Sequence, residues 1–179
     1  MHPRERIPLA IERWGRDELL RRLGQTLRLQ AADPIEGDLL DLAIFLGERQ
    51  ADRSWTAEVS QGHAYWAQVW AARALLYVWD DALAPDVVVA LDHPSWRVRE
   101  MALKVVVSRE IGCADVLEPL ASDDVPRVRT ALARALGGVG EAEHAPLLRR
   151  LGEDHDPAVT RAADRALARL ARRVDLVDH

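Results

Sequence analysis

Basic side chains recur at one fixed position in successive segments of this sequence. Four segments can be aligned on small apolar residues, which are Ala67, Val98, Val128 and Val159. The residue six positions later is basic in every segment: Arg73, Lys104, Arg134 and Arg165. A guanidinium group is planar and presents paired N–H donors, which match a carboxylate or a phosphate. The repeated position therefore predicts a row of side chains that binds an anionic partner.

Two neighbouring positions extend this candidate surface. One residue before the aligned positions stand Trp66, Arg97, Arg127 and Ala158, and two residues after them stand Val69, Glu100, Thr130 and Arg161. Trp and Arg are the residue types most enriched at energetically dominant sites of protein interfaces. We expect Trp66 to be exposed beside Arg97, and Trp70 to lie in the core. The candidate partner-binding residues are Trp66, Arg73, Arg97, Lys104, Arg127, Arg134, Arg161 and Arg165.

A structural explanation of the same basic residues stays open. Those near helix C-termini offset the helix macrodipole. Arg99 and Arg129, one residue past the aligned valines, are expected to pair with acidic residues of the turns, namely Asp92, Asp123, Asp124 and Asp154. Lys104 is the one Lys among 24 basic residues. This excess of Arg is typical of a high-GC, bacterial-type coding sequence.

The elements that must position these residues are helices. Val98, Val128 and Val159 are 30 and 31 residues apart, and apolar or small residues follow each of them at +3, +4, +7 and +8. That spacing lies on one face of an α-helix. A shorter apolar segment precedes each helix, at 85–92, 114–121 and 143–151. The unit is a short helix, an acidic turn and a longer helix, and such units bury their faces by stacking.

Start and stop signals accompany the longer helices. Ser95 and Asp156 can cap the first and third, and Pro126 and Pro157 suit a first helical turn. Gly137 and Gly138 are expected to end the second helix.

The whole chain, 1–179, is expected to form one α-solenoid domain. Its regular repeats are 85–109, 114–137 and 143–173, with a degenerate repeat over 37–80 that contains a long loop at 50–62. Residues 1–36 read as an N-terminal helical cap, in which Gly15 and Gly24 are weak points.

Two segments carry a resemblance to a known family: DDVPRVRTALARALG at 123–137 and LGEDHDPAV at 151–159. They resemble HEAT-like repeats of the short, phycobilin-lyase type, well over 85–173 and poorly over 37–80. The sequence departs from that pattern at Thr160, where the family favours Arg, and at Ser95–Trp96, where it favours Asp-Pro. The resemblance implies an all-α, right-handed, armadillo-type solenoid whose second helices line a concave face. It also implies binding more often than catalysis.

Composition narrows the function further. The chain is 49% hydrophobic and 30% charged, which excludes disorder over most of its length. The single Cys113, expected to be a buried small side chain, excludes a disulfide framework. No apolar run is long enough to span a membrane, and we expect a cytoplasmic protein. Motifs for phosphate loops, nucleophile elbows and zinc proteases are missing, so the expected role is non-enzymatic, without metal or cofactor.

These features favour a scaffold that binds an acidic protein segment on a basic face. One alternative is nucleic-acid binding or repair, because HEAT-like alkylpurine DNA glycosylases use an Arg- and Trp-lined concave surface, although a net charge of −5 argues against it. A second alternative, suggested by the repeat type alone, is a bilin-lyase-like helper. The sequence does not identify the partner.

Overall fold

The described part of the chain is built from helices and turns. A computed structural model describes residues 3–30, 33–47, 63–112 and 114–174, and no strand occurs among them. The predicted all-α class is therefore confirmed. The expected loop at 50–62 and Cys113 lie outside the described residues. The chain divides into two compact units, 1–101 and 102–179, and each is described separately below.

The first unit contains the N-terminal helices and the degenerate repeat. Its elements are α1 (Pro3–Trp14), α2 (Arg16–Arg28), α3 (Gly37–Gly47), α5 (Tyr65–Ala74), η3 (Asp81–Leu83), α6 (Ala84–Val89), η4 (Ala90–Asp92) and the start of α7 (Trp96–Arg109). Helix α2 packs against α1, α5 and α6, and α3 packs against α5.

The two glycines of the N-terminal region have different roles. Gly15 separates α1 from α2 with a φ of 81°, a conformation that favours glycine, so the predicted break is confirmed there. Gly24 lies inside α2, and the prediction of a break there is wrong. A Cβ on Gly24 would lie 2.6 Å from Asp86 Oδ2, so the glycine permits the close approach of α6.

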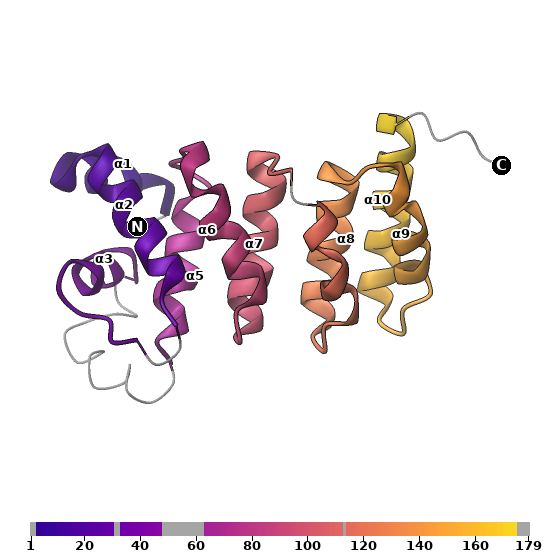
Figure 1. The fold of residues 1–179 in the computed structure, drawn as a ribbon, viewed down its shortest axis with the longest axis horizontal. Helices are drawn as coiled ribbons and strands as arrows, with labels where there is room; N and C mark the ends of the chain where they lie inside the picture. The colour runs from indigo at the N-terminus through magenta and orange to yellow at the C-terminus, as the bar shows by residue number, and fades with distance from the viewer. Residues whose placement is uncertain (1–2, 31–32, 48–62, 113, 175–179) are drawn as a thin grey trace. The chain divides into compact units, whose positions relative to one another are not determined.

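The second unit contains the two most regular repeats. After the rest of α7 come η5 (Ala114–Val116), η6 (Glu118–Ser122), α8 (Pro126–Val139), η7 (Ala142–His144), α9 (Ala145–Gly152) and α10 (Pro157–Val174). Helix α10 packs against both α8 and α9, as Figure 1 shows. The short helix expected at 114–121 is two 3₁₀ turns instead, η5 and η6. Pro119 near the start of η6 has no N–H to donate, which works against a continuous α-helix there.

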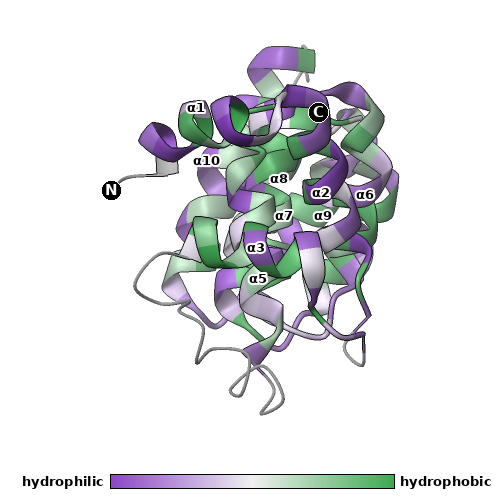
Figure 2. Cartoon of the chain, turned by 90° about the vertical axis from the view of Figure 1, so that its left-hand side faces the viewer, coloured by the Kyte–Doolittle hydropathy of each residue, from purple (hydrophilic) through white to green (hydrophobic). Residues whose placement is uncertain are grey.

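The predicted core faces are confirmed. Val98, Val128 and Val159 are completely buried, and Trp70 is buried in the first unit. Figure 2 shows hydrophobic and hydrophilic residues alternating along individual helices, α1 among them. The amphipathic spacing read from the sequence is thus the spacing that the helices use for packing.

The helix starts follow the sequence signals, and one helix end does not. Pro126 and Pro157 are the first residues of α8 and α10, and Asp156 caps α10 by accepting the N–H of Ala158 at 2.7 Å. The predicted stop at Gly137 and Gly138 is wrong, because α8 continues to Val139. Gly137 serves packing: a Cβ there would lie 2.8 Å from the Cα of Ala166 in α10.

No described helix is long and apolar enough to cross a membrane.

Candidate partner-binding surfaces

A pocket lined by arginines lies between α8 and α10. Its volume is about 250 Å³. Its basic walls are Arg134 of α8 together with Arg161, Arg165 and Arg169 of α10. Its small residues are Gly137, Ala158, Ala162 and Ala166. We call this site the arginine pocket.

Helix geometry explains why these arginines converge. Arg161, Arg165 and Arg169 are four residues apart, so they stand above one another on one face of α10, about 6 Å apart along the axis. The four arginines of the pocket are exposed, whereas Ala162 and Ala166 are buried. Small residues at the helix contact bring α8 and α10 close together. The long basic side chains therefore surround the small residues of the pocket, which form its floor.

The charge of this pocket is not compensated from its walls. Helix α8 has no acidic residue, and the one acid of α10, Asp164, lies near α9, where its Oδ1 would be 3.6 Å from a Cβ on Gly152. Within the described ranges, Arg134, Arg161, Arg165 and Arg169 form no hydrogen bond or ion pair. Their N–H donors are available to an anion, and several guanidinium groups around one pocket attract negative charge.

A second set of arginines is structural. Arg129 donates to both carboxylate oxygens of Asp154, at 2.7 and 2.9 Å, and to the carbonyl of Asp123 at 2.6 Å. The expected pairing of Arg129 with a turn acid is therefore found. The hydrogen bonds from Arg129 lower the pKa of Asp154, and the same contact raises the pKa of Arg129. Arg99 donates to the carbonyls of His93 and Pro94, at 2.7 and 2.9 Å.

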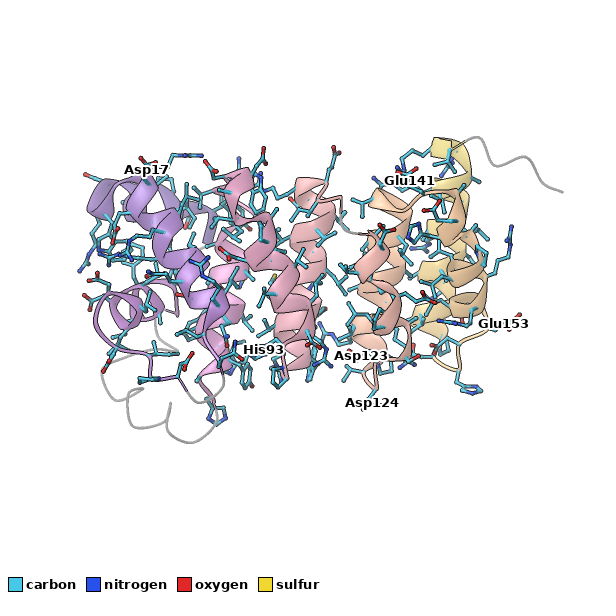
Figure 3. The ribbon with its side chains drawn as sticks, viewed as in Figure 1. Asp17, His93, Asp123, Asp124, Glu141 and Glu153 are labelled. Carbon is cyan, nitrogen blue, oxygen red and sulfur yellow. The ribbon has the colours of Figure 1, made fainter. Side chains whose placement is uncertain are left out.

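The turn before each long helix uses the same hydrogen bond. Asp123 accepts the N–H of Val125 at 2.9 Å, and Asp154 accepts the N–H of Asp156 at 2.8 Å. His93 takes the equivalent role through Nδ1, which accepts the N–H of Ser95 at 2.9 Å. Figure 3 labels His93 and Asp123 at these turns. Burial lowers the pKa of His93, with a smaller contribution from the charge of Arg99. The neutral ring is the form that accepts this bond.

The first unit places Arg97 among aromatic rings. The guanidinium carbon lies 4.4 Å from the ring centre of Trp96, 5.5 Å from that of Trp66 and 5.9 Å from that of Tyr65. Trp66 also stacks with Tyr65 and Trp70, with ring centres 5.5 and 6.1 Å apart. We call Tyr65, Trp66, Trp96 and Arg97 the aromatic–arginine cluster. All four residues are half-buried, so Trp66 is less exposed than the sequence predicted.

The structure brings some predicted site residues together and leaves others apart. Arg134, Arg161 and Arg165 share the arginine pocket, and Trp66 contacts Arg97 in the first unit. Arg73 is exposed in the last turn of α5, Lys104 is half-buried in α7, and Arg127 is exposed in the first turn of α8. None of these three lines the arginine pocket.

Other positions differ from the sequence analysis. Val69 and Thr130, at positions that the repeat register places on the candidate surface, are buried. Arg169 lies outside the register of the predicted site, which covers the start of each long helix, although its spacing of four from Arg165 marks the same helix face. The contacts of Tyr65 and Trp96 with Arg97 are not among the predictions made from the sequence.

The repeat architecture agrees with a family match. Residues 114–177, which include both walls of the arginine pocket, match the family model for HEAT repeats. This segment is built from HEAT repeats. The described residues are all-α, in agreement with a HEAT-like repeat fold. The phycobilin-lyase subtype expected from the sequence stays a prediction, since the matched model represents HEAT repeats in general. No curated protein and no solved structure matches the chain.

Proposed function

We propose that this HEAT-like repeat protein is a binding scaffold that holds an acidic protein segment in the arginine pocket. The observation that supports the proposal most is the set of four exposed guanidinium groups around one pocket, with no acid facing them from either helix. HEAT repeats commonly mediate protein–protein interactions, which favours a protein partner. Carboxylates of an acidic segment would accept paired N–H bonds from Arg134, Arg165 and their neighbours.

The floor of the pocket favours a peptide as well. Gly137, Ala162 and Ala166 give a shallow apolar surface between the arginines, on which a small side chain of the segment can pack. A net charge of −5 opposes the long-range attraction of nucleic acid, whose binding relies on a basic excess. Helix α8 has no acidic residue and Asp164 of α10 lies near α9, so the two described walls of the pocket give it a positive local field.

The test uses a fluorescein-labelled oligoglutamate peptide and charge reversal. Arg165→Glu and Arg134→Glu each place a carboxylate in the pocket, so each should weaken peptide binding at least tenfold, about 1.4 kcal/mol. Arg149→Glu is the matched control, because Arg149 is an exposed arginine of α9 outside the pocket. It should bind as the wild type does. Equal affinity in all three variants would overturn the proposal, as would preference for a single-stranded DNA of equal charge.

A further inference from the structure

We propose that the aromatic–arginine cluster is a second anchoring point, which takes a carboxylate flanked by an aliphatic side chain on a protein segment. This inference rests on the proposed function for the class of partner, but it concerns other residues in the other unit. It is carried by the way Tyr65, Trp66 and Trp96 hold Arg97 and by what they leave open.

Three aromatic rings surround the guanidinium group of Arg97. Their centres lie within 4.4 to 5.9 Å of the guanidinium carbon, and such cation–π contacts restrict the positions that the group can take. Within the described residues, Arg97 has no hydrogen-bond acceptor and no acidic partner. The indole rings of Trp66 and Trp96 carry an N–H donor and no acceptor for its N–H groups.

A half-buried guanidinium group without an acceptor has N–H donors that no protein group satisfies. Its N–H donors need water or an incoming oxygen, and a carboxylate satisfies two of them at once. Because the ring contacts already restrict Arg97, a carboxylate that binds it removes less side-chain freedom than it would from a fully exposed arginine. The positive charge of Arg97 therefore selects an acidic residue of the partner.

The half-buried rings determine which kind of side chain fits next to that acidic residue of the partner. Trp66 and Tyr65 remain partly exposed beside Arg97, so they offer apolar surface to a side chain next to the carboxylate. A nucleobase would need a free ring face for stacking. Trp66 already has Tyr65, Trp70 and Arg97 against its ring, so it is poorly placed to stack with a base. An aliphatic side chain can pack against whatever part of the rings is exposed, and an acidic–aliphatic pair on a peptide is the chemistry that fits.

The experiment compares two labelled peptides, one of oligoglutamate and one of alternating Glu and Leu, on the full-length chain. Arg97→Gln removes the charge, and Arg97→Lys keeps the charge but loses the planar group. We expect Arg97→Gln to weaken the Glu–Leu peptide about tenfold and Arg97→Lys to restore only part of that loss. Arg13→Gln is the matched control, since Arg13 is an exposed arginine of α1 in the same unit, with its guanidinium carbon 5.1 Å from the ring centre of Trp14. It should leave affinity unchanged.

These peptides and variants can overturn either proposal without overturning the other. Loss of oligoglutamate binding in Arg165→Glu, with unchanged Glu–Leu affinity in both Arg97 variants, would overturn the second anchor and leave the arginine pocket standing. Arg97-dependent binding of the Glu–Leu peptide that Arg165→Glu does not alter would support the second anchor and count against the pocket. Thermal unfolding of each variant checks that the compared proteins are folded. Preference of the wild type for single-stranded DNA over the Glu–Leu peptide would also overturn the assignment.

Discussion

Arg129 and Asp154 form a two-bond ion pair that ties the first turn of α8 to the turn before α10. The bonds measure 2.7 and 2.9 Å, and the side chains are 16% and 11% exposed. The same Arg129 also donates to the carbonyl of Asp123, so one side chain fastens two successive repeat turns. This use separates Arg129 from the arginines of the pocket, whose N–H groups have no acceptor in the described part of the chain.

Replacing Asp154 with Ala should destabilise the chain by about 2 to 3 kcal/mol. The substitution leaves the largely buried Arg129 without its carboxylate, which is the costly way to break an ion pair, and some remaining exposure reduces the cost. Urea unfolding at neutral pH measures the difference. Glu153→Ala, at the exposed neighbouring position, should change stability by no more than about 0.5 kcal/mol. Equal effects of the two substitutions would contradict a fastening role for Arg129 and Asp154.

The same pair predicts a loss of stability in acid. Because Arg129 holds the pKa of Asp154 below its ordinary value of 3.8, the folded chain binds that proton less readily than the unfolded chain. The contribution is complete above that value and is lost as the pH falls through the lowered pKa of the folded state. Unfolding curves measured down the acidic range should show a steeper decline for the wild type than for Asp154→Asn. Parallel declines would show that this carboxylate contributes nothing to the acid dependence.

His93 predicts a second, separate pH dependence. Its ring accepts the N–H of Ser95 through Nδ1 and its pKa is lowered by burial, so the folded chain disfavours the protonated ring. Stability should be complete above the ordinary value of 6.5 and should fall as the pH drops from there through the lowered pKa. His93→Asp copies the residue type at Asp123 and Asp154 and should abolish the decline in this window. His155→Ala, at an exposed histidine, should leave the decline as it is.

Adjacent glycines of α8 should respond to alanine with opposite signs. A Cβ at Gly137 would meet Ala166 Cα at 2.8 Å and Ala166 Cβ at 2.9 Å, so Gly137→Ala must separate α8 from α10 at a cost of about 1 to 3 kcal/mol. A Cβ at Gly138 would meet Val107 at an ordinary 3.6 Å. Gly138→Ala should therefore raise stability by up to about 1 kcal/mol through helix propensity. Thermal unfolding distinguishes them, and equal shifts would contradict the close approach of α8 and α10.

Periodicity predicted the helices well because burial enforces it. The valines at 98, 128 and 159 are fully buried, as the spacing required. Local sequence signals gave wrong helix ends where tertiary contacts determine the residue type. Gly137 reads as a helix stop, yet it lies inside α8. Glycine is needed there because Ala166, 29 residues further along the chain, packs too close for a Cβ. Gly24 likewise reads as a weak point, and its reason is Asp86 of α6. A glycine that ends a helix and one that admits a neighbour look alike in sequence.

The candidate site could be predicted only in part for a similar reason. Repeat register found Arg134, Arg161 and Arg165, because a shared register implies a shared face. Register also grouped Arg127 and Lys104 with them, although these do not line the pocket, since its walls depend on how α8 and α10 cross. The rings around Arg97 come from the starts of two different helices, α5 and α7. The contact between them depends on how α5 and α7 pack, which a local sequence pattern does not specify.

The most direct test of the central claim is side-chain NMR of the arginine Nε–H groups during titration with oligoglutamate. We predict saturable shifts for Arg134, Arg161, Arg165 and Arg169, while the signals of Arg149 and of Arg129, which is hydrogen-bonded to Asp154, stay in place. Such a pattern would locate the acidic segment between α8 and α10. Shifts spread evenly over all arginines, or shifts absent from the four pocket residues, would contradict the claim that this pocket binds an acidic segment.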